Sequence, residues 1–328
     1  MCIESDTLDD VMNVLLGRLL AQEQVIRATR GSFKELLAVS FCLRKPRARL
    51  SRSEGKGKIF SALGEFLWYM SGDIKLDYID YYVPERFRKE SDDNINVRSG
   101  YGDRLFNFRG LNQIDNVISL LKTNRSTRRA VIQLYDAQDI AKKYKSIPCT
   151  CTLQFIIRDD CLHLITSMRS NDAYIGLPHD VFSFTMLQEI IARATDVEVG
   201  EYRHFAGSLH LYDCQFADAQ AYLDEGFQSE IEMPQMPNGD QWHSVRTLEE
   251  LAQTIREGKP VDLAATGLDE YWKDLVRLLQ AYSASRRRDA AELKKLKAEM
   301  HSPVYGMFIE ARLDKLSEPR SQRPARTR

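Results

Sequence analysis

The chain has 328 residues, of which 43% are hydrophobic and 28% are charged, so it can build one large core or a core with an appendage. Its 46 lysines and arginines against 47 acidic residues give a formal net charge of -1, which argues against a general affinity for nucleic acid or membrane surfaces. Six irregularly spaced cysteines do not suggest a secreted disulfide framework. The acidic N-terminus does not look like a signal peptide, and no apolar run reaches the length of a membrane span, so we expect a cytoplasmic protein.

Hydrophobic periodicity predicts alternating helices and strands in the first two thirds of the chain. A hairpin with its turn at Asp159-Asp160 is expected to join two of the strands, and the polar, aromatic stretch 76–107 shows no period and is predicted to be a long loop. Predicted helices cover residues 8–24, about 60–70, 112–121, 181–196 and 217–226, and predicted strands cover about 33–44, 131–136, 149–158, 161–170 and 199–213.

The composition changes beyond about Gly226, where proline and acidic residues become frequent. The periodicity of residues 276–300 predicts one or two exposed helices. The basic tail 321–328 is expected to be disordered. We therefore divide the chain into a core, 1–225, and a C-terminal helical extension, 226–328.

The segment SIPCTCTLQF (146–155) places two cysteines two residues apart at the start of a predicted strand. It could be a redox pair, half of a metal site, a buried strand or the seat of a nucleophile. It has neither the C-x-x-C spacing nor a second cysteine pair for zinc. Cysteines in strands are mostly inert, but Cys149 follows a proline at the first strand residue, where nearby guanidinium groups could stabilise a thiolate.

Four arginines lie in turns or at strand ends, each within two residues of a serine or threonine: Arg30, Arg128, Arg129 and Arg169. Guanidinium groups beside hydroxyls suit a phosphate. A single turn arginine is more often simply solvated, but four such positions favour phosphate binding.

Three further features need a reason. Glu65 stands in an otherwise apolar helix. Asp180, in the polar stretch MRSNDAYIGLPHD (168–180), is either an N-cap or a ligand of a binding loop. His210 and Tyr212 alternate on one predicted strand and either bind a sugar hydroxyl or form a structural pair.

These motifs resemble the thymidylate synthase family, in the same order, from about Arg27 to Ala217. Pro148-Cys149 with Gln154 resembles the family's nucleophile motif. The other matching motifs are Arg128-Arg129, Arg169-Ser170-Asn171-Asp172 with Gly176, His210-Leu211-Tyr212, and Glu65 with Trp68. The resemblance implies an α+β fold with a large mixed β-sheet packed by helices, and a sheet face that forms a dimer interface.

The departures from the family pattern point to a subgroup. Asp180 stands where thymidylate synthases have the asparagine that recognises uracil. When its carboxyl is protonated, an aspartate complements the C4 amino group and N3 of cytosine. Thr150 replaces a histidine and Ser208 an aspartate. The I-W-x-x-W segment is missing from YYVPERFRKES (81–91), as is the short apolar C-terminus that closes over folate. The chain is thus more similar to the cytidylate and deoxycytidylate hydroxymethylases.

The resemblance implies that 5,10-methylenetetrahydrofolate is the co-substrate, that no metal is used, and that a hydroxymethyl group is built at C5 of CMP or dCMP, with a slight preference for CMP because Ala173 is small. Alternatives are a C5-methylase, a thymidylate synthase-type enzyme, a non-catalytic nucleotide- or RNA-binding regulator, and a redox or metal protein. We expect a homodimer that binds neither nucleic acid nor membranes. The resemblance implies that Cys149 is the nucleophile and that Glu65 and Tyr101 take part in activating water. It implies that Arg30, Arg169 and Ser170 bind the phosphate, that Arg128 and Arg129 reach the partner's site, that Asp180 binds the base, and that His210 and Tyr212 bind the sugar. The implied folate contacts are Asp172, Trp68 and Gly176.

Overall fold

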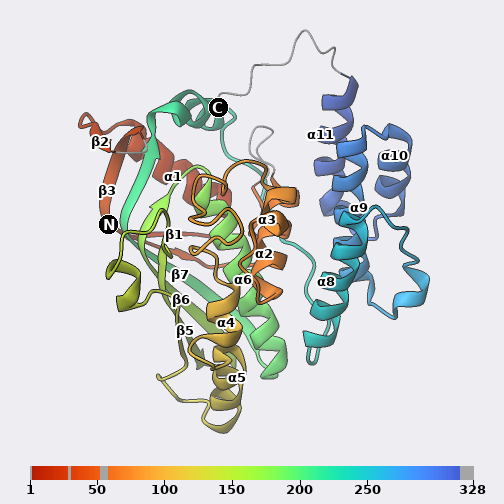
Figure 1. Cartoon of the computed structure of the whole chain (residues 1–328), viewed down its shortest axis with the longest axis horizontal. Helices are drawn as coiled ribbons and strands as arrows, with labels where there is room; N and C mark the ends of the chain where they lie inside the picture. The colour runs from red at the N-terminus through yellow and green to blue at the C-terminus, as the bar shows by residue number, and fades with distance from the viewer. Residues whose placement is uncertain (1, 29–30, 52–57, 318–328) are drawn as a thin grey trace.

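The computed structural model describes residues 2–28, 31–51 and 58–317, and these form a mixed sheet of seven strands packed by helices (Figure 1). The predicted α+β class is confirmed. The basic tail 321–328 lies outside the described residues. The strands are β1 (Cys2–Ser5), β2 (Ile26–Ala28), β3 (Gly31–Leu43), β4 (Val131–Gln133), β5 (Thr150–Arg158), β6 (Cys161–Asp172) and β7 (Glu198–Tyr212).

The sheet runs in the order β1-β3-β7-β6-β5-β4, with β2 paired to β3. β1 is parallel to β3 and β6 is parallel to β7, whereas the other pairs are antiparallel. The predicted β5–β6 hairpin is present, and its turn residues Asp159 and Asp160 have φ values of 49° and 54°. Two left-handed residues give a turn whose twist matches that of the strands.

The helices form layers beside the sheet. Contacts join α1 and α6 to the sheet, α2 to α6, and α9 to α2, so α2 lies between α6 and the C-terminal helices (Figure 1). The helices are α1 (Leu8–Leu20), α2 (Ile59–Met70), α3 (Leu76–Tyr82), α4 (Gly102–Asn107), α5 (Gln113–Thr123), α6 (Gly176–Ala194), α7 (Phe216–Asp224), α8 (Trp242–Arg256), α9 (Glu270–Arg287), α10 (Ala290–Glu299) and α11 (Gly306–Ser317). None of the described helices combines the length and the apolar character that crossing a membrane requires.

Side-chain caps start several of these helices. The Thr7 hydroxyl accepts from the backbone N–H of Asp10 at 3.1 Å before α1, and Asp269 accepts from Tyr271 at 2.9 Å before α9. Such caps satisfy backbone donors that have no partner within the helix.

Two predictions about secondary structure were wrong. The stretch 76–107 is not one loop, because it contains α3 and α4, which are too short to show a helical period. Residues 276–300 do form two helices, α9 and the largely exposed α10, but the exposure expected for both is wrong for α9, which is buried along one side at Val276, Leu278 and Leu279. Its apolar positions belong to the same hydrophobic cluster as those of α2 and α6, so the helices after residue 226 pack onto the core.

Candidate active site

Cys149 lies just before β5, and Arg169 of β6 holds the segment in place. Arg169 donates from Nε to the carbonyl of Pro148 at 3.0 Å and from Nη2 to that of Ile147 at 3.2 Å. The same Nη2 lies 3.7 Å from the Cys149 sulfur, and the Cys149 side chain is partly exposed. A guanidinium in contact with a thiol favours its ionised form, as the sequence predicted for this position.

Cys151 has a different environment. The β5–β6 register shifts between Thr150 and Thr152, so a bulge bends the strand at Cys151. Burial raises the pKa of the Cys151 thiol, although Arg169 acts in the opposite direction. Cys149 and Cys151 are both free thiols, and the described residues include no group of three or more histidines, cysteines or carboxylates arranged to hold a metal ion.

Glu65 lies inside the molecule on α2. Its Oε1 accepts from the Tyr69 hydroxyl at 2.7 Å, one turn along the helix, while Oε2 is buried with no hydrogen-bond partner among the described residues. Burial raises the pKa of this carboxyl, and Arg86 and the Tyr69 bond oppose the increase. Trp68, on the same helix, has its indole N–H buried and without a hydrogen-bond partner in the described part of the chain.

Asp180 lies in the second turn of α6 and is 7% exposed. Its Oδ2 accepts from the Asn171 side-chain amide at 2.7 Å. A Cβ added at Gly176 would lie 3.3 Å from that amide nitrogen, so glycine leaves room for the bond. Burial, with a contribution from Glu65, raises the pKa of Asp180 to about 8, so the carboxyl is protonated at neutral pH.

Tyr101 is hydrogen-bonded to Thr150, the residue after Cys149. Its hydroxyl oxygen accepts from the backbone N–H of Thr150 at 3.2 Å and from the Thr150 hydroxyl at 2.9 Å. Burial, followed by the nearby Asp180 and Cys149, raises its pKa well above the usual range, so Tyr101 remains a neutral hydroxyl.

Asp172, predicted for folate, and His210 and Tyr212, predicted for the sugar, lie at the ends of β6 and β7. Asp172 is opposite His210 in the parallel pair, and the Ser170 hydroxyl is 3.5 Å from His210 Nδ1. The rings of His210 and Tyr212 are 5.0 Å apart, in edge contact. The Asp172 carboxylate accepts from the backbone of Tyr174 and Ile175 and from Gln215, so it also stabilises the turn into α6.

Arg128 and Arg129 are exposed and lie far from Cys149 along the sheet. Val131 is opposite Gln154 in the antiparallel β4–β5 pair, which places Arg129 near Ile156. Cys149 is on the order of 20 Å away at the usual rise per strand residue. The structure therefore does not bring these two arginines to the site of their own chain. Arg30 lies outside the described residues.

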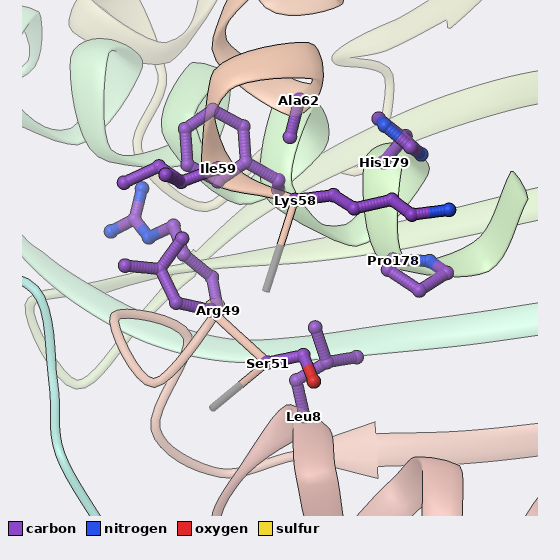
Figure 2. Close-up of a pocket in the computed structure, with 10 residues that line it drawn as sticks. Leu8, Arg49, Ser51, Lys58, Ile59, Ala62, Pro178 and His179 are labelled. Atoms are coloured by element: carbon purple, nitrogen blue, oxygen red, sulfur yellow. The ribbon is translucent and has the colours of Figure 1, made fainter. Parts of the chain in front are cut away.

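A small pocket adjoins the N-terminal ends of α2 and α6 (Figure 2). Lys58 extends along it toward Pro178 and His179. His179 contacts the Ser61 hydroxyl through Nε2 at 2.9 Å and the Ile175 carbonyl through Nδ1 at 2.7 Å. Arg49, which also lines the pocket, forms a fully buried ion pair with Glu189.

Sequence reasoning missed three residues of this site. Tyr69 is four residues after Glu65, and the helical spacing alone could have suggested their contact. Asn171 lies within the quoted R-S-x-D motif, where its role as partner of Asp180 has no local signal. Arg86 lies in an aperiodic segment, and only the folded chain brings its charge to bear on Glu65 and Asp180.

Comparisons with known proteins identify the family of the chain. A family model described as "Thymidylate synthase" matches residues 53–251, which is more than half of the chain. Among relatives, the thymidylate synthase of Buchnera aphidicola is 31% identical over 164 residues, covering 48% of this chain and 62% of that protein. The deoxyuridylate hydroxymethyltransferase of Delftia phage PhiW-14 is 29% identical over 211 residues, which cover 60% of this chain and 58% of that protein. The chain spans about three fifths of the length of these relatives. It therefore belongs to the thymidylate synthase family.

Proposed function

We propose that the protein transfers a one-carbon unit from 5,10-methylenetetrahydrofolate to C5 of the cytosine of CMP or dCMP, and that water completes the reaction to give the 5-hydroxymethyl nucleotide and tetrahydrofolate. The observation that carries the choice of base is Asp180, a buried carboxyl that is protonated at neutral pH and held by Asn171. The Delftia phage relative, whose name states a hydroxymethyltransferase, supports the product. Its name also states a uracil nucleotide, so the base needs a direct test.

A protonated carboxyl offers one donor and one acceptor. The carbonyl oxygen of Asp180 would accept from the C4 amino group of cytosine, and its hydroxyl would donate to N3. An ionised aspartate would instead face the N3 lone pair with a second lone pair, which is repulsive. Burial keeps the proton on Asp180 and thereby supports cytosine recognition.

Cys149 is the proposed nucleophile. Its thiolate would add to C6 of the pyrimidine and place electron density on C5, which is otherwise too weak a nucleophile. The contact with Arg169 supports this role because it stabilises the thiolate and fixes the preceding backbone. After the new carbon–carbon bond has formed and the C5 proton and tetrahydrofolate have left, an exocyclic methylene remains. Water adds to this methylene, and the thiolate then leaves C6.

Glu65 is the proposed base for that water. Its buried Oε2 has no hydrogen-bond partner within residues 2–28, 31–51 and 58–317 and can accept a proton, and its raised pKa brings the carboxyl toward the range useful for proton transfer. Tyr101, a neutral hydroxyl beside Cys149 and Asp180, would assist by donating a hydrogen bond.

The co-substrate supplies a carbon at the oxidation level of formaldehyde and carries an anionic glutamate tail. The pocket beside Lys58 and His179 offers cationic and hydrogen-bonding groups for such a tail, on the same helices that carry Glu65 and Asp180 (Figure 2). The N–H of Trp68 and Oδ1 of Asn171 are buried polar atoms with no partner among the residues that the structure describes, and a pterin ring could satisfy them. Asp172 and Gly176 stay proposed as folate contacts.

The remaining substrate contacts and the homodimer are also proposals. Ser170, Arg169 and Arg30 would hold the phosphate, and His210 and Tyr212 the sugar. Leu37 and Phe205, on paired strands, are 70% and 41% exposed, and these apolar side chains support a second copy docking on the sheet. Arg128 and Arg129, remote from their own site, are then placed to serve the partner's site. Ala173 is small and buried, which favours a ribose over a deoxyribose.

The test incubates the purified protein with methylenetetrahydrofolate and each of CMP, dCMP, UMP and dUMP, and weighs the products by mass spectrometry. We expect a gain of one CH₂O unit on a cytosine nucleotide and tetrahydrofolate as the second product. A gain of CH₂ with a rise in dihydrofolate absorbance would instead identify a C5-methylase or a thymidylate synthase-type enzyme. Nucleotide binding with no product would favour the regulator.

A further inference from the structure

Arg86 lies in the loop that follows α3, and aromatic contacts connect it to α2. Its guanidinium carbon is 5.2 Å from the centre of the Phe87 ring, and the Phe87 ring is 5.4 Å from that of Trp68. Trp68 stands one turn after Glu65 on α2. Stacking therefore holds the loop against the helix that carries the proposed base.

Arg86 and Glu65 have complementary unpartnered atoms. Nη1 of Arg86 and Oε2 of Glu65 are both buried, and neither has a hydrogen-bond partner among the described residues. Buried charged groups without partners are costly, so each of these two atoms favours a counterpart of opposite charge or a water between them. Among the carboxylates that act on the Arg86 charge, Glu65 comes first, followed by Asp172 and Glu90.

We propose that Arg86 is a positioning residue of this active site, whose guanidinium keeps the Glu65 carboxylate ionised and turned toward the reacting water, directly or through one bridging water. The inference rests on the proposed function, in which Glu65 accepts a proton from that water. Without this cation, a carboxyl as buried as Glu65 would hold its proton and could not act as a base.

The other groups around Glu65 do not replace Arg86. Tyr69, on the same helix, lowers the pKa of Glu65 through one hydrogen bond, while Glu90, from the Arg86 loop, raises it. Asp180 of α6 is also coupled to Glu65 and feels the Arg86 charge. Among the described groups that act on the Glu65 carboxyl, Arg86 is the cation.

The first experiment compares pH–rate profiles of the wild-type protein, Arg86→Met and Arg86→Lys. We expect the acidic limb of Arg86→Met to move up by about one pH unit or more, with activity at neutral pH about tenfold lower and partly recovered at higher pH. Arg86→Lys should restore most of the profile. Arg88→Met is the matched control, since Arg88 is exposed and pairs with Asp80 at 2.6 Å. An Arg86→Met profile with an unmoved acidic limb would overturn the proposal.

A second experiment needs no substrate. Infrared difference spectra recorded against pH follow the band of the protonated Glu65 carboxyl, which is assigned by its loss in Glu65→Gln. The pH midpoint of this band should be higher in Arg86→Met than in the wild type. Thermal unfolding verifies that each variant is folded; if Arg86→Met is not, Arg86→Gln replaces it. An unchanged midpoint contradicts the role of Arg86 whatever the reaction is. A shifted midpoint in a protein without hydroxymethylase activity would refute the proposed function and leave the electrostatic coupling standing.

Discussion

The side-chain amide of Asn171 donates to the carboxyl of Asp180 across 2.7 Å and so ties the end of β6 to the second turn of α6. The bond occupies one acceptor site on Oδ2 of Asp180, and a carboxyl oxygen can accept a second hydrogen bond, so both oxygens stay available to a substrate. Two residues that are nine positions apart in the sequence thereby set the orientation of the group that is proposed to read the base.

Replacing Asp180 with asparagine should shift the preference from cytosine toward uracil nucleotides. The NH₂ group of the new amide can donate to O4 of uracil while its oxygen accepts from the N3–H, which is the reverse of the pattern that the protonated carboxyl would offer to cytosine. A mispaired buried polar group costs about 1–3 kcal/mol, so the ratio of kcat/KM values should change by roughly tenfold or more. Competition assays with CMP, dCMP, UMP and dUMP measure it, with Asp224→Asn, a surface change on α7, as control. An unchanged ratio would remove Asp180 from base recognition.

The same substitution should change how stability depends on pH. The pKa of Asp180 is raised from 3.8 to about 8 on folding, so the folded state binds a proton that the unfolded state releases between these values. Stability contributed by this proton is complete below about pH 4 and is lost as the pH rises toward 8, at about 1.4 kcal/mol per pH unit. Urea unfolding at pH 5 and pH 8 should therefore show a larger loss for the wild type than for Asp180→Asn. Equal losses would mean that Asp180 ionises normally.

Cys149→Ala should abolish turnover while nucleotide binding stays measurable, because binding depends mainly on arginines and Asp180. Cys151→Ala should leave most of the activity, since burial keeps its thiol protonated. Steady-state assays and calorimetric titration of the nucleotide distinguish the two. A dead Cys151→Ala with an active Cys149→Ala would reverse the assignment of the nucleophile.

Gly176→Ala should weaken nucleotide binding, because the new Cβ would lie 3.3 Å from the Asn171 amide nitrogen and push it away from Asp180. The expected change is a severalfold rise in KM with a stability loss of about 1–2 kcal/mol. Gly17→Ala in α1 is the control. Its Cβ meets a side chain only at 3.9 Å, and it should be neutral or slightly stabilising. Similar kinetics for both variants would argue against the packing role of Gly176.

Tyr282→Phe tests whether the C-terminal helices form a separate domain. The Tyr282 hydroxyl on α9 donates to the carbonyls of Tyr81 at 2.8 Å and Tyr82 at 3.2 Å, so its loss should cost about 1 kcal/mol. The fluorescence of Trp68 monitors unfolding at α2, and that of Trp272 monitors unfolding at α9. We expect tryptophan fluorescence and circular dichroism to show one coincident transition that shifts in the variant. Two transitions, only one of which moves, would support the predicted division at residue 226.

Local patterns in the sequence were sufficient for several of the regular elements. The β5–β6 hairpin was predictable from alternating residues on both sides of Asp159-Asp160, and α6 from a long helical period. Ordered short motifs also indicated the family and the positions of Cys149, Glu65 and Asp180. Each of these signals lies within a few residues, so no knowledge of long-range packing was needed.

Only the tertiary structure decided which groups act on one another. The burial of α9 depends on its packing against α8, α10, α11 and α2, and its Tyr282 hydroxyl reaches the carbonyls of Tyr81 and Tyr82, about 200 residues earlier in the chain; no periodicity reveals these contacts. Arg86 comes to act on Glu65 and Asp180 because Phe87 packs on Trp68. Electrostatic coupling and burial depend on distances in space, which the folded core sets, and the sequence order of these residues carries no record of those distances.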